Sequence, residues 1–508
     1  MKLQELFSSH PTSTYWLTRF VFLRLLGFVY FAAFLSLAVQ VIPLLGHTGL
    51  LPVDTFLSHF PGSSMDNFIR LPSLFWFHIS DSLLLSLAWV GVMLSLLVLL
   101  GFANVPVLVA LWFLYMSFVH VGQLWYSYGW EIQLLETGFL AIFMVPWWDA
   151  RPFPKIPVPT SIIWLLRWLS FRIYLGAGLI KLRGDPCWRD LTCLQYHYET
   201  QPIPNPLSRW LYFFPVWFHT LGVLWNHLVE LIAPWLVFWP RAARLTAGML
   251  MISFQFFLMV SGNLSFLNWL TILPVIACFD DQFLRKFLPT YLVKKAEYAA
   301  AHQQVSKTHK IVPWVIFILI AYLSIPVIQN LMSSHQVMNT SFNSFNLVNT
   351  YGAFGSVGKE RYELILQGTD EGTLTPSTRW KEYEFIAKPG NITRSLPFIA
   401  PYQPRIDWQI WFAAMQRPED NPWLIHLIWK LLHHDANTLT LIANNPFPDH
   451  PPTYIQVEFY RYEFVPPTDS SGAVWKRTYV GEWLPPLFVS TPGLKEFVKG
   501  NGWNGYEK

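Results

Sequence analysis

Long apolar runs occupy the first two thirds of the chain and predict a bundle of membrane-spanning helices. Between Asp81 and Glu131 there is no Asp, Glu, Lys or Arg. A hydrocarbon core needs roughly 20 apolar residues per helical span, so this interval accommodates two helices. Helices of soluble proteins show a polar face, and none is visible here. The pattern therefore favours a membrane bundle over a large soluble core.

Nine segments of the chain fit this description. The turn residues Gly101–Asn104 and the following Pro106 mark the break between the second and third of them. Hydrophobic residues make up 53% of the chain and charged residues only 13%, which agrees with a membrane protein. The predicted spans lie near Arg19–Leu44, Leu83–Gly101, Val105–Trp125, Ile132–Trp148, Ile162–Ile180, Val216–Trp239, Leu245–Ser261, Leu264–Phe279 and Pro313–Gln329.

Several of these spans contain polar residues within an otherwise apolar run. Charged side chains inside a bilayer are costly, so they usually face the interior of a bundle and pair with one another. We expect pairs such as Glu136 with Arg172 and Glu230 with Arg167. The full set of intramembrane polar residues is Arg19, Arg24, Glu136, Arg167, Arg172, His227 and Glu230.

The distribution of Lys and Arg predicts the orientation of the bundle. The loop Asp281–Lys310 carries six Lys or Arg residues, and two other loops carry Arg151 with Lys155 and Arg241 with Arg244. If the spans alternate, all three loops lie on one side, and basic loops are typically cytoplasmic. The N-terminus is then cytoplasmic, whereas Lys181–Arg209 and the chain after about Ser333 face the opposite side. In a bacterium we expect that membrane to be the inner membrane.

No cleavable signal peptide is expected. The first apolar run is too long and contains too many arginines for a standard signal sequence, so we expect this span to act as an uncleaved start signal.

After about residue 337 the composition changes and predicts a second domain. A helix should begin at Asn421-Pro422, because Asn is a good cap and Pro suits the first turn. The stretch Pro401–Ala414 is expected to dock against the membrane part. We expect residues 1–332 to form the transmembrane domain and residues 333–508 a β-rich α+β domain on the non-cytoplasmic side. Alternating polar and apolar residues predict strands in Arg361–Gln367, Lys381–Ala387, Tyr454–Val465 and Trp475–Trp483.

The segment Gly176–Pro206 combines charged, aromatic and sulfur-containing residues at the end of an apolar helix. Cys187 and Cys193 are separated by five residues and should lie on the side where disulfides persist. This spacing suits a structural disulfide and differs from the two-residue spacing of thioredoxin-type pairs. An exchange-active pair and free thiols are the alternatives. Cys278, at the end of an apolar span, is expected to be a buried small side chain.

Other polar residues of the two outer segments are expected to fix loops. His197, Glu199 and Asp190 lack the compact spacing of a metal motif, which favours a hydrogen-bonding role and predicts no metal. We expect local ion pairs between Arg189 and Asp190 and between Arg405 and Asp407. Of the sequons that begin at Asn263, Asn339 and Asn391, only Asn391 is a reasonable glycosylation candidate.

Several classes of activity find no support in the sequence. It contains no glycine-rich phosphate loop, no G-x-S-x-G turn and no nucleic-acid motif. The net charge of +4 is concentrated in the predicted cytoplasmic loops and needs no acidic partner. We therefore expect no cofactor and no nucleic acid, with the lipid bilayer as a constant partner. A transporter fits the helix count alone, but no internal repeat is visible.

Several long and unusual strings, in order along the chain, resemble the lipase maturation factor family. In the membrane part these are YGWEIQLLETGFLAIF (Tyr128–Phe143), GLIKLRGDPCWRDLTCLQYHYETQPIPNP (Gly178–Pro206), NHLVELIAP (Asn226–Pro234) and SGNLSFLN (Ser261–Asn268). In the outer part they are YGAFGSVGKERYE (Tyr351–Glu363), APYQPRIDWQIWFAAM (Ala400–Met415) and NPFPDHPP (Asn445–Pro452). The resemblance covers essentially the whole chain.

This resemblance implies a multi-pass protein of the endoplasmic reticulum that helps secreted lipases to reach an active, assembled state. It implies a non-enzymatic, chaperone-like maturation factor with secreted lipases as clients. The outer domain and the Gly176–Pro206 segment would then form the surface that holds a client. The candidate residues of this surface are Trp188, Arg189, Asp190, His197, Tyr198, Glu199, Arg405, Asp407 and Trp408.

Lys181 is the candidate for a catalytic role. A lysine at a helix end is usually an interfacial residue whose charged end reaches toward water. However, AGLIKL (Ala177–Leu182) followed by Trp188 faintly resembles the vitamin K-dependent carboxylase family, in which a lysine acts as the base on a reduced quinone. Burial lowers the pKa of a lysine and makes such chemistry physically reasonable. The alternative function is thus a membrane enzyme that acts on a lipid-soluble substrate.

Overall fold

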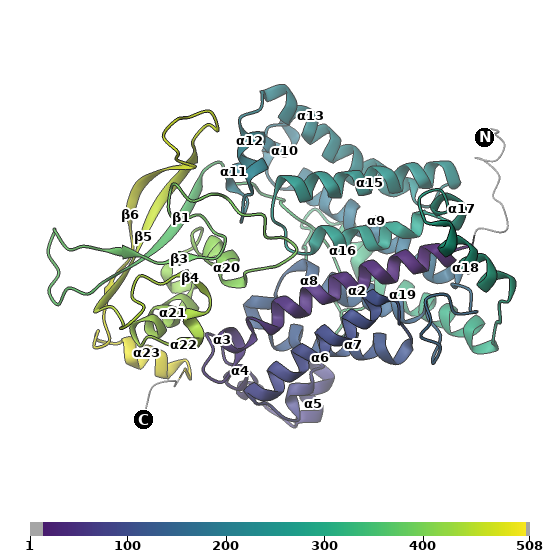
Figure 1. Ribbon diagram of the computed structural model, residues 1–508, viewed down its shortest axis with the longest axis horizontal. Helices are drawn as coiled ribbons and strands as arrows, with labels where there is room; N and C mark the ends of the chain where they lie inside the picture. The colour runs from purple at the N-terminus through teal and green to yellow at the C-terminus, as the bar shows by residue number, and fades with distance from the viewer. Residues whose placement is uncertain (1–13, 504–508) are drawn as a thin grey trace.

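The computed structural model describes residues 14–503 and has two parts that lie side by side along the long axis of the molecule (Figure 1). A bundle of helices forms one part, and a domain that contains the strands forms the other. The N-terminal end of the described chain lies at the far end of the bundle, and the C-terminal end lies in the strand-containing domain. The predicted combination of a helical membrane part and a β-containing domain is confirmed.

Within residues 14–503, five helices are long and apolar enough to cross a membrane. They are α2 (Trp16–Ala38), α6 (Asp81–Leu100), α9 (Thr160–Arg183), α15 (Arg241–Ser261) and α19 (Lys307–Met332). Helix α6 begins where the Ser80 hydroxyl accepts a hydrogen bond from the Leu83 N–H, and it ends at Gly101, which has φ of +121°. The chain is therefore an integral membrane protein by the length and composition of its helices.

Shorter apolar helices complete the bundle. Helix α13 continues through a π-helical turn into α14, and α16 continues into a 3₁₀ turn. All nine predicted spans fall on helical segments, but the count of nine crossings stays a prediction. The shorter apolar helices are α7 (Val105–Val121), α8 (Gly129–Ile142), α13 (Val216–His227), η3 (Leu228–Ile232), α14 (Ala233–Leu236), α16 (Leu267–Val275) and η4 (Ile276–Cys278).

Small helices occupy both ends of the bundle. On the side of the outer domain these are α3 (Val41–Leu45), α4 (Val53–Ser58), α5 (Ser64–Arg70), η1 (Leu74–Trp76), η2 (Gln123–Tyr126), α10 (Pro186–Arg189), α11 (Leu194–Thr200) and α12 (Pro206–Tyr212). At the far end lie α17 (Asp281–Leu284) and α18 (Thr290–Ala301).

The outer domain is built on a four-stranded antiparallel sheet in the order β2-β1-β5-β6. The predicted strands at β1, β5 and β6 are confirmed, whereas the predicted strand Lys381–Ala387 is split between two sheets. The strands are β1 (Arg361–Thr369), β2 (Lys381–Glu382), β3 (Glu384–Phe385), β4 (Ile442–Asn444), β5 (Tyr454–Phe464) and β6 (Trp475–Leu487). The helices are α20 (Arg405–Ala413), η5 (Pro418–Asp420), α21 (Pro422–Leu432), α22 (Ala436–Leu439) and α23 (Leu494–Gly500).

Helix α21 begins where the Asn-Pro pair predicted it. Pro422 occupies the first turn, but the Asn421 side chain accepts a hydrogen bond from Trp423 Nε1 and makes no capping bond to a helical N–H. Leu424, Leu427, Ile428 and Leu431 form an apolar face of the helix and are buried. This helix therefore contributes its apolar side to the core of the outer domain.

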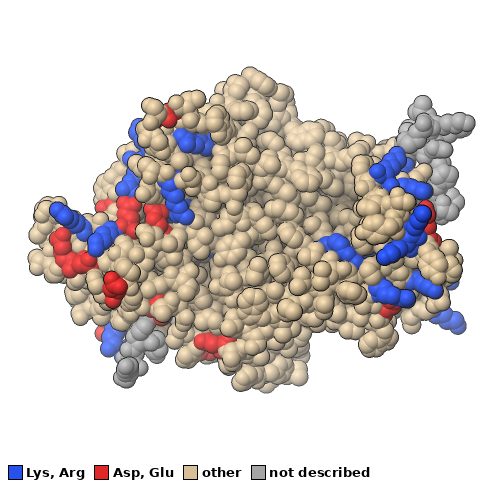
Figure 2. Space-filling model, viewed as in Figure 1, with Lys and Arg blue, Asp and Glu red and all other residues tan. Residues whose placement is uncertain are grey.

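Charged residues are concentrated at the two ends of the molecule. Figure 2 shows basic side chains over the bundle end that carries α17 and α18, and both charge signs over the outer domain. A broad band between the two ends is almost free of charge on this face. An uncharged band of this kind is what a bilayer requires around a helical bundle.

Inside the bundle the expected pairing of Glu136 with Arg172 is confirmed. Arg172 donates to the Glu136 carboxylate, and the pair is buried. The expected pairing of Glu230 with Arg167 is wrong. Arg167 Nε donates to the Ala277 carbonyl oxygen and its Nη2 to the Tyr15 hydroxyl. Backbone carbonyls thus take the place of a carboxylate around this arginine, as they also do around Arg19.

The predicted docking segment connects the two parts of the molecule. It forms helix α20, and Arg405 at its start donates to Glu131 of α8 at 2.9 Å. Both side chains are fully buried. In a second contact, Arg361 of β1 donates to the carbonyl oxygen of Glu199 in α11 and to those of Gln201 and Pro202, which follow this helix. The outer domain is therefore fixed to the bundle at several places, of which these are two.

Replacing Arg405 with Met should destabilise the protein strongly. The Glu131 carboxylate would remain buried without its cation, and breaking a buried pair in this way costs about 3–5 kcal/mol. We expect a clear fall in the melting temperature of the detergent-solubilised protein. Arg417→Met is the control, because the Arg417–Asp420 pair is largely exposed and contributes little. Equal melting temperatures for the two variants would contradict the proposed role of the Arg405–Glu131 pair.

Candidate functional site

The wall of the candidate site depends on a close contact between helix α9 and the segment 351–356. A Cβ atom at Gly176 would lie 2.5 Å from the Tyr351 carbonyl oxygen, so only glycine allows this approach. Gln336 Nε2 also donates to the carbonyl oxygen of Gly176. Trp188 Nε1 donates to the Phe354 carbonyl oxygen at 2.8 Å. The segment is thereby held along the outer half of α9.

A buried ion pair joins α9 to the π-helical turn η3. Lys181 Nζ donates to both carboxylate oxygens of Glu230 at 2.6 Å, and both side chains are only 6% exposed. A Cβ atom at Gly178 would lie 3.0 Å from the Glu230 Cβ and 2.6 Å from a Leu231 methyl group. The glycine therefore lets η3 come close enough to α9 for the pair to form. Single π-helical turns are frequent at functional sites.

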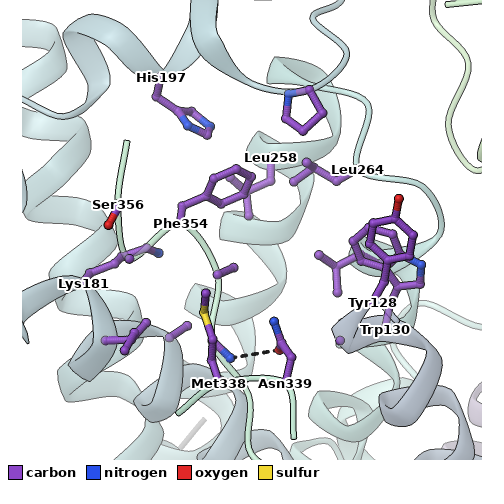
Figure 3. Close-up of a pocket in the computed structure, with 18 of the residues that line it drawn as sticks. Tyr128, Trp130, Lys181, His197, Leu258, Leu264, Met338, Asn339, Phe354 and Ser356 are labelled. Carbon is purple, nitrogen blue, oxygen red and sulfur yellow. Dashed lines mark hydrogen bonds between the residues drawn. The ribbon is translucent and has the colours of Figure 1, made fainter. Parts of the chain in front are cut away.

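A large cavity of about 1180 Å³ opens beside this ion pair. Its walls come from α9, α11, α13 and α15 of the bundle, from the segment 351–356 and from α20 of the outer domain. Figure 3 shows Lys181, His197, Phe354 and Ser356 around one part of it, with the stacked Tyr128 and Trp130 rings at another. The lining is mainly aromatic and aliphatic. Ligand sites in proteins are typically concave and largely apolar, with a few placed polar groups.

The Gly176–Pro206 segment forms a compact cover over the end of α9. The expected disulfide joins Cys187 to Cys193, and Cys278 is a buried free cysteine, as predicted. The Trp188 ring lies 5.0 Å from Lys181 Nζ, and the Trp188 carbonyl oxygen accepts a hydrogen bond from His227 Nε2. The disulfide loop thus places Trp188 directly over the ion pair.

Most residues predicted for a partner surface are buried. Arg189 and Asp190 are exposed, and the expected ion pair between them is wrong, because Arg189 donates to the Leu182 carbonyl oxygen instead. The others are buried, and they line the cavity or bind neighbouring residues of the bundle and the outer domain. This buried group is Trp188, His197, Tyr198, Glu199, Arg405, Asp407 and Trp408.

The expected ion pair between Arg405 and Asp407 is wrong. Arg405 binds Glu131, whereas Asp407 accepts the backbone N–H groups of Ala387 and Lys388 at 2.6 and 2.8 Å. Both residues belong to one helix, α20, and side chains two positions apart on a helix point to different faces. Asp407 therefore organises the loop that follows β3, and Arg405 holds the bundle.

Glu199 lies beneath the edge of the outer sheet. Its carboxylate accepts the Phe464 N–H at 2.6 Å. Burial raises the pKa of Glu199 to about 7, although that hydrogen bond and the charge of Arg361 act in the opposite direction. Within residues 14–503, no group of three or more His, Cys, Asp or Glu residues could hold a metal ion. Asn391 is exposed, and its side chain accepts hydrogen bonds from Thr393 of the same sequon.

The sequence did not identify Lys181 as the partner of Glu230. It also gave no indication that this ion pair lies beside a cavity. Gly178, three residues before Lys181 on the same helix, was the available signal for a close helix contact. Asn226, in the last turn of α13, lines the same cavity and was not singled out either.

Comparison with known proteins agrees with this architecture. A family model described as the lipase maturation factor transmembrane domain matches residues 17–286, and one described as its C-terminal domain matches residues 347–485. The chain belongs to the lipase maturation factor family. Both lipase maturation factor 1 and lipase maturation factor 2 are similar to it.

Lipase maturation factor 1 of Homo sapiens is 46% identical over 518 residues, which cover 97% of this chain and 91% of the human protein. The Mus musculus protein of the same name is also 46% identical, over 97% of this chain and 90% of its own length. Lipase maturation factor 2 of Xenopus laevis is 30% identical over 96% of this chain and 84% of its own length. No solved structure matches the chain.

Replacing Lys181 and Glu230 separately and together should show that they act as a pair. Lys181→Met or Glu230→Met leaves one buried charge without a partner and should cost about 3–5 kcal/mol of stability. The double variant removes both charges, so we expect it to be more stable than either single variant. Thermal unfolding in detergent measures the cycle. If the loss of stability in the double variant equals the sum of the losses in the two single variants, the two residues are not coupled.

Glu199 should make the stability depend on pH. Between about pH 4.5 and pH 7 the folded state binds a proton at Glu199 that the unfolded state does not, so stability falls as the pH rises through this range. Relative to Glu199→Gln, the natural protein should lose about 2 kcal/mol between pH 5 and pH 8. Unfolding at several pH values provides the comparison. Glu463→Gln, which removes a more exposed neighbouring carboxylate, should leave the pH dependence largely unchanged.

Proposed function

We propose that this protein is a maturation factor for secreted lipases. The observation that carries the proposal is the similarity to lipase maturation factor 1, which extends over 97% of the chain at 46% identity. It includes both the bundle and the outer domain, so the whole architecture is shared rather than one module. We infer that secreted lipases are the clients.

The proposed mode of action is that of a non-enzymatic, chaperone-like platform on the non-cytoplasmic side of the membrane. The basic end of the bundle, over α17 and α18, would face the cytoplasm, and the outer domain would face the lumen of the endoplasmic reticulum. Nine crossings of the membrane would place the N-terminus and the outer domain on opposite sides. Residues 1–332 would form the membrane domain and residues 333–508 the lumenal domain, on which Asn391 is exposed for glycosylation.

The exposed dipeptide Arg189–Asp190 is the proposed contact point for a client. It projects from the disulfide-closed loop beside the outer domain. The buried candidates, among them Tyr198, Glu199 and Trp408, would contribute indirectly because they hold the loop and the outer domain in place.

A second candidate function, a membrane enzyme with Lys181 as base, is favoured by one observation. Lys181 lines a large and mainly apolar cavity, as a lipid-soluble substrate would require. However, both carboxylate oxygens of Glu230 accept hydrogen bonds from its ammonium group. A base must offer a free lone pair, so this pair would have to separate before any reaction. We therefore rank the non-enzymatic role first.

Expression of the chain should restore the activity of secreted lipases in cells that lack their own lipase maturation factors. We expect the specific activity of a co-expressed lipase, per mass of secreted protein, to rise at least fivefold. A secreted protein of another class serves as the control and should not change. Unchanged lipase activity with normal amounts of this protein in the membrane would contradict the maturation role.

The Lys181→Met/Glu230→Met double variant distinguishes the two functions in the same assay. A maturation factor should keep most of its effect, because the variant preserves apolar packing without leaving a buried charge. An enzyme that uses Lys181 as its base would lose all activity, with its melting temperature intact.

A further inference from the structure

Helix α12 and the turn that follows it present an apolar, aromatic face to the outside of the molecule. Leu207, Trp210 and Phe214 are all exposed, and the Trp210 side chain is 52% exposed. These residues recur at spacings of three and four positions, so they share one face. Neighbouring exposed apolar residues of this kind mark a surface that contacts another molecule or a membrane.

Another side of α12 binds the outer domain. Arg209 Nε donates to the Val465 carbonyl oxygen at 2.7 Å, and its Nη2 donates to the carbonyl oxygens of Pro466 and Ala473 at 3.0 and 2.9 Å. These acceptors belong to the loop between β5 and β6. Helix α12 therefore joins the outer sheet to the exposed apolar face.

The apolar face of α12 continues into the predicted span that follows it. From α13 to α14, exposed apolar residues again recur at spacings of three and four positions. A stripe of this kind on the outside of a membrane bundle faces lipid, so the face of α12 adjoins the lipid-facing side of α13. The residues of the stripe are Trp217, Leu221, Leu224, Leu228, Ile232 and Trp235.

The segment from α13 to α14 is long enough to cross the hydrocarbon without α12. Val216–Leu236 is helical throughout and extends roughly 30 Å at about 1.5 Å per residue, which matches the thickness of a bilayer core. Arg241, shortly after it, binds Asp280 next to α17 at the far end of the bundle. Helix α12 precedes Val216 and therefore lies at the level of the lipid head groups, where aromatic residues are enriched.

A second exposed apolar face lies across the bundle from α12. Figure 1 shows α12 and α5 on opposite sides of the bundle, both toward the outer domain. Met65 and Ile69 of α5 lie one turn apart and are 57% and 64% exposed. Phe68 of the same helix packs against Phe113 of α7, with ring centroids 6.1 Å apart. This end of the bundle therefore carries an exposed apolar face on each side.

The charges near the two faces select no particular head group. Arg209 is the single Asp, Glu, Lys or Arg residue in Pro206–Asn226, and backbone carbonyls occupy its guanidinium group. On α5 the exposed Asp66 and Arg70 have opposite signs. Interfacial helices bind through buried apolar area and through attraction to anionic lipids, and here the first contribution dominates.

We propose that α12 and α5 are interfacial anchors, whose apolar faces lie in the head-group and glycerol layer of the bilayer on the side of the outer domain. The partner of both faces is the phospholipid of the membrane. Because Arg209 binds the loop between β5 and β6, the α12 anchor also fixes the distance between the outer sheet and the membrane surface. This inference does not depend on the maturation role.

Depth-dependent fluorescence quenching of the full-length protein tests the proposal. A single cysteine is introduced at an exposed position and labelled with a small fluorescent dye. The natural cysteines do not interfere, because Cys187 and Cys193 form a disulfide and Cys278 is buried. The labelled protein is reconstituted in phosphatidylcholine vesicles whose lipids carry a nitroxide either on the head group or at the middle of an acyl chain.

The position of the nitroxide should separate the anchors from the middle of the span. We expect the dye at Leu207→Cys and at Ile69→Cys to be quenched at least threefold more strongly by the head-group nitroxide than by the acyl-chain nitroxide. Leu224→Cys, near the middle of the lipid-facing stripe, should show the reverse order. Deep quenching at Leu207→Cys and Ile69→Cys, as at Leu224→Cys, would overturn the proposal.

A position on the outer domain provides the control for a dye in water. Tyr479 of β6 is exposed, and the dye at Tyr479→Cys should be quenched by iodide in the buffer at least threefold more strongly than the dye at Leu207→Cys. Neither nitroxide should quench it appreciably. If Leu207→Cys and Ile69→Cys behave like Tyr479→Cys, the two faces lie in water, and the proposal is wrong.

Photolabelling of the natural protein decides the question if a variant fails to fold. The probe is a phosphatidylcholine with a diazirine on its head group, and mass spectrometry locates the adducts. We expect adducts within Pro206–Trp217 and Met65–Phe77, in equal yield when a third of the lipid is phosphatidylserine. Absence of adducts from both ranges would overturn the proposal, and a threefold higher yield with phosphatidylserine would contradict a contact without head-group selection. Lipase activity is not measured, so the outcome is independent of the maturation assay.

Charged substitutions on the α12 face test whether its apolar area holds it in the membrane. In the Leu207→Cys protein, Trp210→Asp with Phe214→Asp should lower the quenching by the head-group nitroxide at least threefold. Val480→Asp with Val489→Asp, two exposed changes on the outer domain, should leave it unchanged. Equal quenching in the two double variants would contradict an anchor that depends on these side chains.

Discussion

Charged side chains buried where the bundle meets the outer domain are the constraint on which the rest of the structure depends. Glu131 requires Arg405, and the Glu136–Arg172 pair also binds the backbone of Asn349. A buried charge without a partner is far more costly than a surface charge, so these contacts permit only one relative placement of the two parts. The segment 351–356 is fixed as a consequence, and with it one wall of the cavity.

The fold was accessible from the sequence where a pattern is local. Apolar runs located the helices of the bundle, alternation located β1, β5 and β6, and Asn421-Pro422 located the start of α21. The pairing of Glu136 with Arg172 and the disulfide were also predicted. Each of these depends on residue types close together in sequence or on a strong requirement for a partner.

The contacts between helices were less accessible. The sequence suggested Arg167 for Glu230, whereas the structure gives it Lys181, and it suggested Asp407 for Arg405, whereas the structure gives it Glu131. A helix that is apolar on every side carries no signal for its rotation about its own axis, so the partner of a single polar residue depends on packing. The burial of Tyr198 and Trp408 also depends on packing. From sequence these residues suggested a binding surface, but contacts between the bundle and the outer domain cover them.

The contacts between the two parts also determine the order in which the protein is completed. Glu131 and Arg405 are 274 positions apart, and the contact between Gln40 and Gln403 spans 363 positions. During synthesis the early helices enter the membrane long before the outer domain exists. Glu131 and Gln40 therefore lack their partners until Arg405 and Gln403 have been synthesised. A protein proposed to assist the assembly of others thus passes, during its own synthesis, through an unfinished state in which these polar groups still lack their partners.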